Sequence, residues 1–240
     1  MTKRIRSAIR KSIAGFALLS VELITVIVLF VFVIIIFTVV AYRVFKLQYG
    51  QFDLYVFDQV AHLITPTMTG LMEFVTFFGS HIFLIPANIA LAIYFLFIKK
   101  HKWYSIKVPV VAIGGVSLLF LLKDLFGRPR PLLPLLQPVS GLSFPSGHAF
   151  MSVSFYGLLI FLSWENVYSR NWKWIVTIFL LLFILLIGFS RIYLRLHYFS
   201  DVVAGYAAGV IWLVLSIWSI RRIERYSQPV IAKANAEVRQ

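Results

Sequence analysis

The chain has 240 residues, of which 60% are hydrophobic and only 13% are charged. Its mean hydropathy of +0.89 is too high for a water-soluble domain and is typical of a membrane protein. Cysteine is absent, which excludes a disulfide framework, a thiolate nucleophile and cysteine-based metal sites. The net charge of +14 does not indicate a nucleic-acid partner, because the Lys and Arg residues do not cluster on a soluble module.

Apolar segments are spread over the whole chain without a long hydrophilic block, so we expect one membrane domain over residues 1–240. Six segments each approach the roughly 20 apolar residues that cross about 30 Å of hydrocarbon. They are residues 18–41, 74–98, 106–122, 149–164, 174–190 and 202–220. The predicted fold class is all-α and integral to the membrane, a bundle of six transmembrane helices over residues 18–220. A basic N-terminus (1–17) and a tail (221–240) flank this core.

Basic residues predict how the spans are oriented. With six spans, the 23 Lys and Arg residues divide into sixteen on the side of both termini and seven on the other side. Because cytoplasmic loops carry the excess of positive charge, we expect both termini in the cytoplasm. Five of the seven outer charges fall in KDLFGRPRP and SRIYLRLHYFSD, and positive charge kept on the disfavoured side indicates a role there.

Two local patterns concern packing. Gly205 and Gly209 are four residues apart in the last span, a spacing that lets a neighbouring backbone approach closely. The segment after the first span carries apolar residues at mixed spacing around Asp53, Asp58 and His62, which predicts a short helix along the outer surface.

Three outer stretches carry residues suited to phosphate. Lys123, Arg130 and Arg191 offer one ammonium and two guanidinium groups, although each alone is also typical of an interfacial residue reaching the headgroups. In PSGH, Ser146 and Gly147 precede an apolar run, so a helix starting there would turn free amides and its positive dipole end toward an anion. Ser146 could equally be a simple N-cap.

Histidines in these stretches suggest catalysis. His148 follows Gly147 directly and would lie beside an anion held at that helix end. In HYFSD, His197 and Asp201 are four residues apart, which allows contact if the segment is helical or turns into a helix at Ser200. A carboxylate that accepts from one ring nitrogen fixes the tautomer and leaves the other nitrogen free as a nucleophile or base. The histidines without such a partner fit ordinary interfacial residues better: His62, His81 and His101.

Together the three motifs resemble the signature of the type 2 phosphatidic acid phosphatase superfamily. Residues 123–131 read K-x6-RP, residues 145–148 read PSGH, and residues 190–201 read SR-x5-H-x3-D. All fixed positions are present and in order. The motifs cover residues 123–201, and the six-span layout extends the resemblance over most of the chain.

The resemblance implies metal-independent hydrolysis of a lipid phosphate or diphosphate at the extracytoplasmic interface of a bacterial-type inner or plasma membrane, without a cofactor. His197 would attack phosphorus and form a phosphohistidine, with Asp201 orienting it, and His148 would protonate the leaving oxygen and then activate water. The phosphate-binding groups would be Lys123, Arg130, Arg191 and the amides of Ser146 and Gly147. Three nearby charged residues receive no role: Asp124, Arg128 and Arg195.

The expected partner is a membrane lipid substrate. Undecaprenyl diphosphate and phosphatidylglycerophosphate, substrates of bacterial members of the family, come first, followed by phosphatidate and diacylglycerol pyrophosphate. Transfer of the phosphoryl group to another lipid is an alternative that the same residues would serve. A lipid or ion transporter is a third, but the charged groups cluster at one face while the middles of the spans are largely apolar. Vanadate-dependent haloperoxidases share the motifs, and the compact six-span chain argues against their chemistry.

Overall fold

The computed structural model describes the backbone of residues 3–47, 50–136 and 140–237, and the side chains of residues 24–47, 50–136 and 140–227. The predicted basic N-terminus (1–17) therefore has no described side chain. All regular structure in the described backbone is helical: α1 (Lys3–Phe45), α2 (Gln51–Ala61), α3 (Pro66–Phe77), α4 (His81–Ile93), the π-helix η1 (Tyr94–Ile98), α5 (Lys102–Phe126), α6 (Gly147–Asn166), α7 (Arg170–Tyr193) and α8 (Phe199–Glu237).

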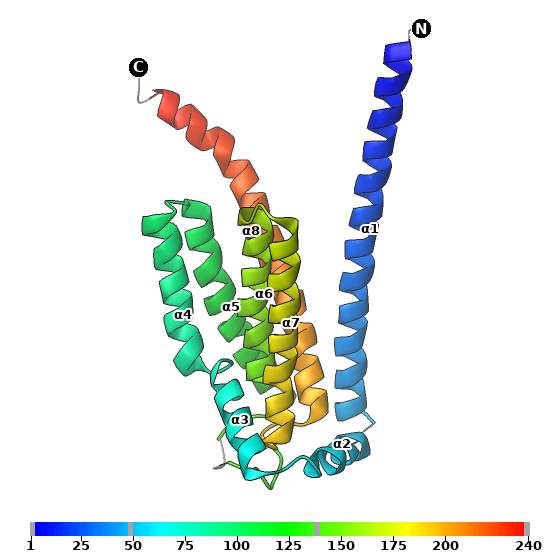
Figure 1. The fold of residues 1–240 in the computed structure, drawn as a ribbon, viewed down its shortest axis with the longest axis vertical. Helices are drawn as coiled ribbons and strands as arrows, with labels where there is room; N and C mark the ends of the chain where they lie inside the picture. The colour runs from blue at the N-terminus through cyan, green and yellow to red at the C-terminus, as the bar shows by residue number, and fades with distance from the viewer. Residues whose placement is uncertain (1–2, 48–49, 137–139, 238–240) are drawn as a thin grey trace.

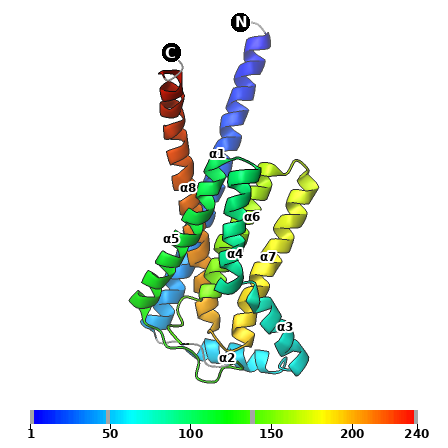
Figure 2. The same ribbon diagram turned by 90° about the vertical axis from the view of Figure 1, so that its left-hand side faces the viewer.

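Among the described residues, six segments are long and apolar enough to cross a membrane, which confirms the predicted fold class. These are Ile24–Phe45, Pro66–Ile98, Lys102–Phe126, Gly147–Asn166, Arg170–Tyr193 and Phe199–Ser227. In the bundle α6 packs against both α7 and α8, α1 against α8, α4 against α5, and α3 against α7. The start of α1 and the end of α8 lie at one end of the bundle, and α2 lies across the opposite end (Figures 1 and 2). This is the short surface helix that the sequence predicted.

The second span differs from its prediction as one helix over residues 74–98. It begins earlier, at Pro66, where Thr65 accepts a capping hydrogen bond from the Met68 amide, and it is interrupted between Phe77 and His81. Gly79 lies in this break, and a Cβ there would lie only 2.6 Å from Cγ2 of Ile187. The missing side chain therefore lets the chain turn directly against α7.

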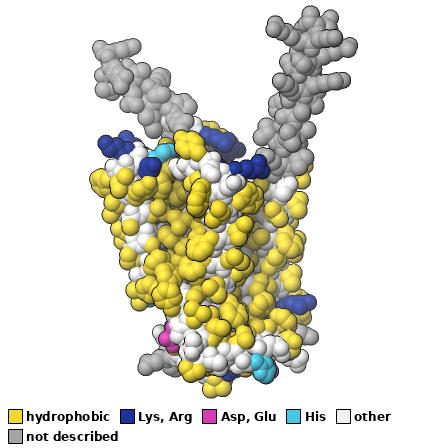
Figure 3. Space-filling model, in the orientation of Figure 1, with side chains coloured by type: hydrophobic (Ala, Val, Ile, Leu, Met, Phe, Trp, Pro, Cys, Tyr) yellow, Lys and Arg dark blue, Asp and Glu magenta, His cyan; other side chains and the backbone are white. Residues whose placement is uncertain are grey.

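The sides of the bundle are covered by hydrophobic side chains, with Lys and Arg gathered toward the end that carries the termini (Figure 3). Phe97 and Leu125 are 66% and 73% exposed on this surface, as expected of helices that face lipid. Inside the bundle, Val108, Leu158 and Ile187 are fully buried.

Close packing of α8 on α6 confirms the prediction for the last span. A Cβ at Gly205 would lie 2.7 Å from the Ser146 carbonyl oxygen, and one at Gly209 would lie 2.9 Å from that of Phe150. Moreover, the Ser146 amide donates to the Asp201 carbonyl over 2.9 Å. The two glycines thus bring the N-terminal ends of α6 and α8 together.

An aromatic cluster joins α1 to the loop between α5 and α6. Phe45 stacks on Phe126 with ring centroids 4.9 Å apart, and both rings meet the edge or face of Phe144 at 5.2 and 4.9 Å. Phe37 packs 6.1 Å from Phe144 as well. Because Phe144 is fully buried and directly precedes PSGH, this cluster fixes the entrance to α6.

Candidate active site

A tight turn between α7 and α8 places His197. Helix α7 ends at Tyr193, and Arg195 adopts a left-handed conformation with φ of 53°. The amides of Leu196 and His197 both donate to the Arg191 carbonyl, over 3.0 and 3.2 Å. These bonds close the end of the helix in the manner of a left-handed C-cap. Arg191 and His197, six residues apart in sequence, are therefore held beside each other.

Asp201 is held at the start of α8, in contact distance of His197 as their spacing predicted. Its Oδ2 accepts from the Tyr198 amide over 2.9 Å, so an acid at the third helical position satisfies the amide before the helix. The same oxygen lies 3.6 Å from Nδ1 of His197. Ser143 lies between them, donating to Oδ2 over 2.5 Å with its oxygen 3.4 Å from Nδ1. All three side chains are buried.

The position of Arg130 indicates which nitrogen of His197 carries the proton. One guanidinium nitrogen of Arg130 lies 3.3 Å from Nε2 of His197 and donates to the Leu196 carbonyl over 3.1 Å. Arginine can only donate, so Nε2 is the acceptor and Nδ1 carries the hydrogen. Burial lowers the pKa of His197 to about 4, against the opposing effect of Asp201. The ring is therefore neutral at pH 7.

The three cations singled out in the sequence converge on the same region. Lys123 donates to the Leu142 carbonyl over 2.5 Å and lies within electrostatic reach of Arg130 and Arg191. Arg191, 4% exposed, donates to the Thr76 hydroxyl of α3 over 2.8 Å. Burial lowers the pKa of Arg130. Three positive groups with few anionic partners form a site that suits a multiply charged anion.

Unpaired polar atoms mark the place where such an anion fits. Among the described side chains, Oγ of Ser146, Oγ of Ser152 and Nε of Arg191 are buried without a hydrogen-bond partner. Ser146 occupies the N-cap position of α6, yet its hydroxyl makes no capping bond, which argues against the simple N-cap interpretation. Buried donors without partners are costly, and a bound phosphate would satisfy the Ser146 hydroxyl and Nε of Arg191.

The backbone amides at this helix end require one correction. The prediction that the Ser146 amide binds phosphate is wrong, because this amide donates to the Asp201 carbonyl. A helix leaves its first amides without carbonyl partners, and in α6 these belong to Gly147 and the two residues after it. The Gly147 amide and the Ser146 hydroxyl are thus the donors at this position.

His148 occupies the first turn of α6, next to these donors. His148 is close enough to Arg191, His197 and Arg130 for their charges to act on it, so it lies in the same region as the cations. A Cβ at Gly79 would lie 3.1 Å from its ring, which shows how closely the turn between α3 and α4 packs against it. His81, which the sequence analysis set aside, is also within electrostatic reach of His148.

Arg128 is a residue that the sequence analysis missed. Its guanidinium donates to Oδ1 of Asp201 over 2.6 Å, to the Ser200 hydroxyl over 2.7 Å, and to Oδ2 of Asp53 over 2.8 Å. Burial acts to lower its pKa, but the two carboxylates outweigh this effect and raise it. The sequence signal that could have identified Arg128 was its positive charge on the side of the membrane that carries few basic residues. Of the other two residues without a role, Asp124 is exposed and Arg195 packs over the Phe57 ring.

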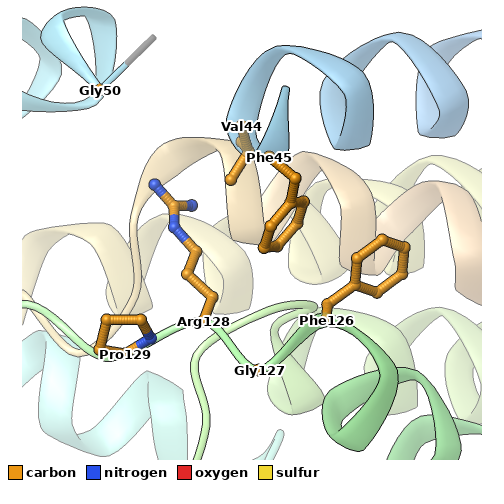
Figure 4. Close-up of a pocket in the computed structure, with 7 residues that line it drawn as sticks. All are labelled: Val44, Phe45, Gly50, Phe126, Gly127, Arg128 and Pro129. Atoms are coloured by element: carbon orange, nitrogen blue, oxygen red, sulfur yellow. The ribbon is translucent and has the colours of Figure 1, made fainter. Parts of the chain in front are cut away.

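An open cavity of about 410 Å³ lies beside this group, between the end of α1 and the loop after α5. Its lining residues are Val44, Phe45, Gly50, Phe126, Gly127, Arg128 and Pro129. In Figure 4 the Arg128 side chain extends from the loop into the space between these elements, with Phe45 and Phe126 to one side. None of the eight site residues expected from the sequence lines it. Within the described side chains, no group of three His, Asp or Glu residues is arranged to hold a metal ion.

Comparison with known proteins identifies the family. Residues 104–225, just over half of the chain, match the family model of the PAP2 superfamily. The chain belongs to the PAP2 superfamily. It is accordingly a multi-pass membrane lipid phosphate phosphatase, a hydrolase, which confirms the enzyme prediction.

Relatives and solved structures agree with this assignment. The chain is 27% identical to phosphatidylglycerophosphatase B of Bacillus subtilis over 68% of this chain and 80% of the relative. It is 28% identical to an undecaprenyl-diphosphatase of Sulfolobus acidocaldarius over 74% of this chain and 81% of that relative. The crystal structure of a transmembrane PAP2-type phosphatidylglycerolphosphate phosphatase from B. subtilis matches with a TM-score of 0.74 at 24% identity, covering 82% of this chain and 98% of that one, and shows the same fold. The crystal structure of Aquifex aeolicus LpxE matches with a TM-score of 0.54 at 26% identity, covering 68% of this chain and 93% of that one.

Proposed function

We propose that this PAP2 protein hydrolyses a lipid phosphate or diphosphate without a metal ion, through a phosphohistidine on His197, at the extracytoplasmic face of the membrane. The observation that carries the proposal is the orientation of the His197 ring. Its Nδ1 is turned toward Ser143 and Asp201, and its Nε2 toward Arg130. The lone pair of Nε2 is thus directed into the region where the cations lie.

In the first step, Nε2 of His197 attacks phosphorus while the bond from phosphorus to the leaving oxygen breaks. The ring becomes positive as the N–P bond forms, and Asp201 stabilises this charge across Nδ1–H. His148, protonated for this step, gives its proton to the leaving oxygen. The lipid alcohol, or the lipid monophosphate when the substrate is a diphosphate, departs.

In the second step, water attacks the phosphohistidine on the opposite side of phosphorus from Nε2. His148, now neutral, takes a proton from this water as the new P–O bond forms and the P–N bond breaks. Inorganic phosphate leaves, His197 is neutral again, and His148 has regained the proton that it gave up. Each histidine therefore ends the cycle in its starting state.

The phosphate oxygens are held by Lys123, Arg130 and Arg191, together with the Ser146 hydroxyl and the Gly147 amide. The unpaired Nε of Arg191 and Oγ of Ser146 support this assignment, because both are buried donors that lack a protein partner. Fixed donors at the equatorial oxygens stabilise the charge that moves onto them as the P–O bond breaks.

The proposed substrates are undecaprenyl diphosphate and phosphatidylglycerophosphate. The relatives named above support both, and they differ in whether a mono- or a diphosphate is cleaved. A phosphate-release panel over these lipids, phosphatidate and diacylglycerol pyrophosphate, with purified protein in detergent, ranks them. Product mass spectrometry with mixed lipids distinguishes release to water from transfer to a second lipid.

The decisive test replaces the proposed nucleophile. His197→Ala should abolish phosphate release in detergent with EDTA present, whereas the unmodified protein should keep its full rate in EDTA. His62→Ala is a matched control, since His62 is an exposed histidine at the end of α2, and its rate should stay normal. Turnover retained by the His197 variant would refute the assigned nucleophile.

A further inference from the structure

Asp53 is a buried acid in a helix that is otherwise largely exposed. It belongs to the first turn of α2, which lies across the end of the bundle, and it is only 2% exposed, while its helix neighbour Asp58 is exposed. A carboxylate is almost never fully buried unless it is paired. Its contacts therefore indicate what it does.

The Asp53 carboxylate accepts hydrogen bonds from Ser200 and from Arg128. Oδ1 accepts from the Ser200 amide over 2.9 Å, and Oδ2 accepts from the Ser200 hydroxyl over 2.6 Å. The first of these bonds satisfies a free amide in the first turn of α8, so Asp53 caps this helix from another part of the chain. Oδ2 also accepts from the Arg128 guanidinium over 2.8 Å.

Through Arg128 this carboxylate reaches the site itself. The same guanidinium donates to Oδ1 of Asp201 over 2.6 Å and lies 4.1 Å from the centre of the Tyr198 ring. Asp201 then presents its other oxygen, Oδ2, to Ser143 and His197. Asp53, Arg128 and Asp201 form a continuous chain of charge-assisted bonds whose last member faces Nδ1 of His197.

The charges in this chain show why a second carboxylate is needed. Arg128 alone would neutralise Asp201 and reduce its ability to stabilise a positive imidazole. The groups facing His197 are otherwise cationic or neutral, namely Arg130, Arg191 and His148, so Asp201 is the anion that opposes them. With Asp53 present, the sum of the three charges is −1, and Arg128 can hold Asp201 in place without cancelling its effect.

We propose that Asp53 is a positioning residue for the reaction: through Arg128 it holds Asp201 against His197 and offsets the guanidinium charge, so that His197 stays in the reactive tautomer. This inference rests on the proposed role of His197. It gives α2, which lies outside the three sequence motifs, an influence on the rate through Arg128 and Asp201.

The test compares Asp53→Asn with Asp58→Asn, which removes the same charge from an exposed position of the same helix. Phosphate release is measured with farnesyl diphosphate and dioleoyl phosphatidylglycerophosphate in detergent. Asp53→Asn should lower kcat by about 10- to 100-fold, the factor that corresponds to one lost hydrogen bond between charged groups, with KM changed less than about threefold. Asp58→Asn should match the unmodified protein.

A second readout separates positioning and charge from simple loss of folded protein. The titration of His197 is followed by NMR of ¹⁵N-labelled imidazole, assigned by its absence in His197→Ala. Removing the negative charge of Asp53 favours the neutral ring, so the His197 pKa should fall further in Asp53→Asn. Arg128→Gln should raise it, and the double variant Asp53→Asn/Arg128→Gln, whose sum of charges is again −1, should return it toward the original value. A merely structural role would lower the folded fraction and move none of these values.

The outcomes are distinguishable from failure of the proposed function. If His197→Ala is inactive and Asp53→Asn behaves as Asp58→Asn in both kcat and titration, the role of Asp53 is refuted while that of His197 stands. If His197→Ala retains turnover, the proposed function fails first. If Asp53→Asn does not fold, Arg128→Gln still tests the proposal. The pKa of His197 should rise in this variant, and an unchanged pKa would refute charge coupling through Arg128.

Discussion

The Ser143 hydroxyl donates a 2.5 Å hydrogen bond to Oδ2 of Asp201, the carboxylate oxygen nearest to His197. Because this proton goes to Asp201, the lone pairs of the Ser143 oxygen face Nδ1 of His197 at 3.4 Å. Ser143 thus connects the histidine and its carboxylate, which are themselves 3.6 Å apart. It lies in the loop after α5, outside the three motifs.

Ser143→Ala should therefore slow the reaction without removing any group that touches phosphate. A hydrogen bond to a charged group contributes about 1.5–3 kcal/mol, so we expect kcat to fall by roughly tenfold or more while KM changes little. The measurement is steady-state phosphate release by the purified variant. Ser140→Ala, at an exposed position of the same loop, is the control and should be neutral. An unchanged kcat in Ser143→Ala would show that Asp201 orients His197 without this hydroxyl.

The pH dependence of His197 follows from its burial. Its pKa of about 4 in the folded protein lies below the ordinary value of about 6.5, so the neutral nucleophile should persist through the usual titration range of histidine. Between these values the unfolded chain binds a proton at this residue and the folded chain does not. The contribution to stability is therefore present above pH 6.5 and is lost as the pH falls through about 4. NMR titration of labelled imidazole checks this, and a midpoint near 6.5 for His197 would contradict it.

Sequence patterns predicted the spans and the residues of the three motifs because both depend on local information. The length and hydropathy of each segment reveal a helix that crosses the membrane, and the four-residue spacing of His197 and Asp201 predicted their contact, although His197 lies just before α8 and not in it. The partners of Arg128 could not be found in this way. Asp53 and Asp201 lie 75 and 73 residues away in sequence, and only the docking of α2 on α8 brings them together.

The same limit explains the two corrections. The Ser146 amide was expected to be free because a helix start exposes its amides, but packing of α8 on α6 supplies the Asp201 carbonyl as its acceptor. The break after Phe77 was missed because residues 74–98 are mostly apolar, and the close approach of Gly79 to Ile187 on α7, which leaves no room for a side chain, involves a distant part of the chain. Both features depend on contacts between distant segments.

The unpaired Ser146 hydroxyl leads to a prediction with opposite effects on binding and stability. Ser146→Ala removes a buried donor without a protein partner, so stability should stay equal or increase. Inhibition by vanadate, a phosphate analogue, should weaken by about tenfold, since one hydrogen bond to a charged ligand is lost.

Ser154→Ala is the matched control for this variant. Ser154 is also buried in α6 but donates to the Phe150 carbonyl over 3.0 Å, so its loss should lower stability by about 1 kcal/mol and leave vanadate inhibition unchanged. Thermal unfolding in detergent and vanadate inhibition constants provide the two measurements. Equal vanadate inhibition of Ser146→Ala and the unmodified protein would remove the hydroxyl from the phosphate site.

The orientation of the bundle can be tested because the natural sequence contains no cysteine. Leu132, in the loop that carries the site, is 93% exposed, and Tyr168, in the loop between α6 and α7, is fully exposed. The excess of basic residues on the side of the termini predicts that Leu132→Cys faces the exterior and Tyr168→Cys the cytoplasm. A membrane-impermeant maleimide should then label Leu132→Cys in intact cells, and Tyr168→Cys only after permeabilisation. The reverse pattern would place the site in the cytoplasm, and the lipid phosphate supplied to Arg130 and His197 would then have to come from the inner leaflet.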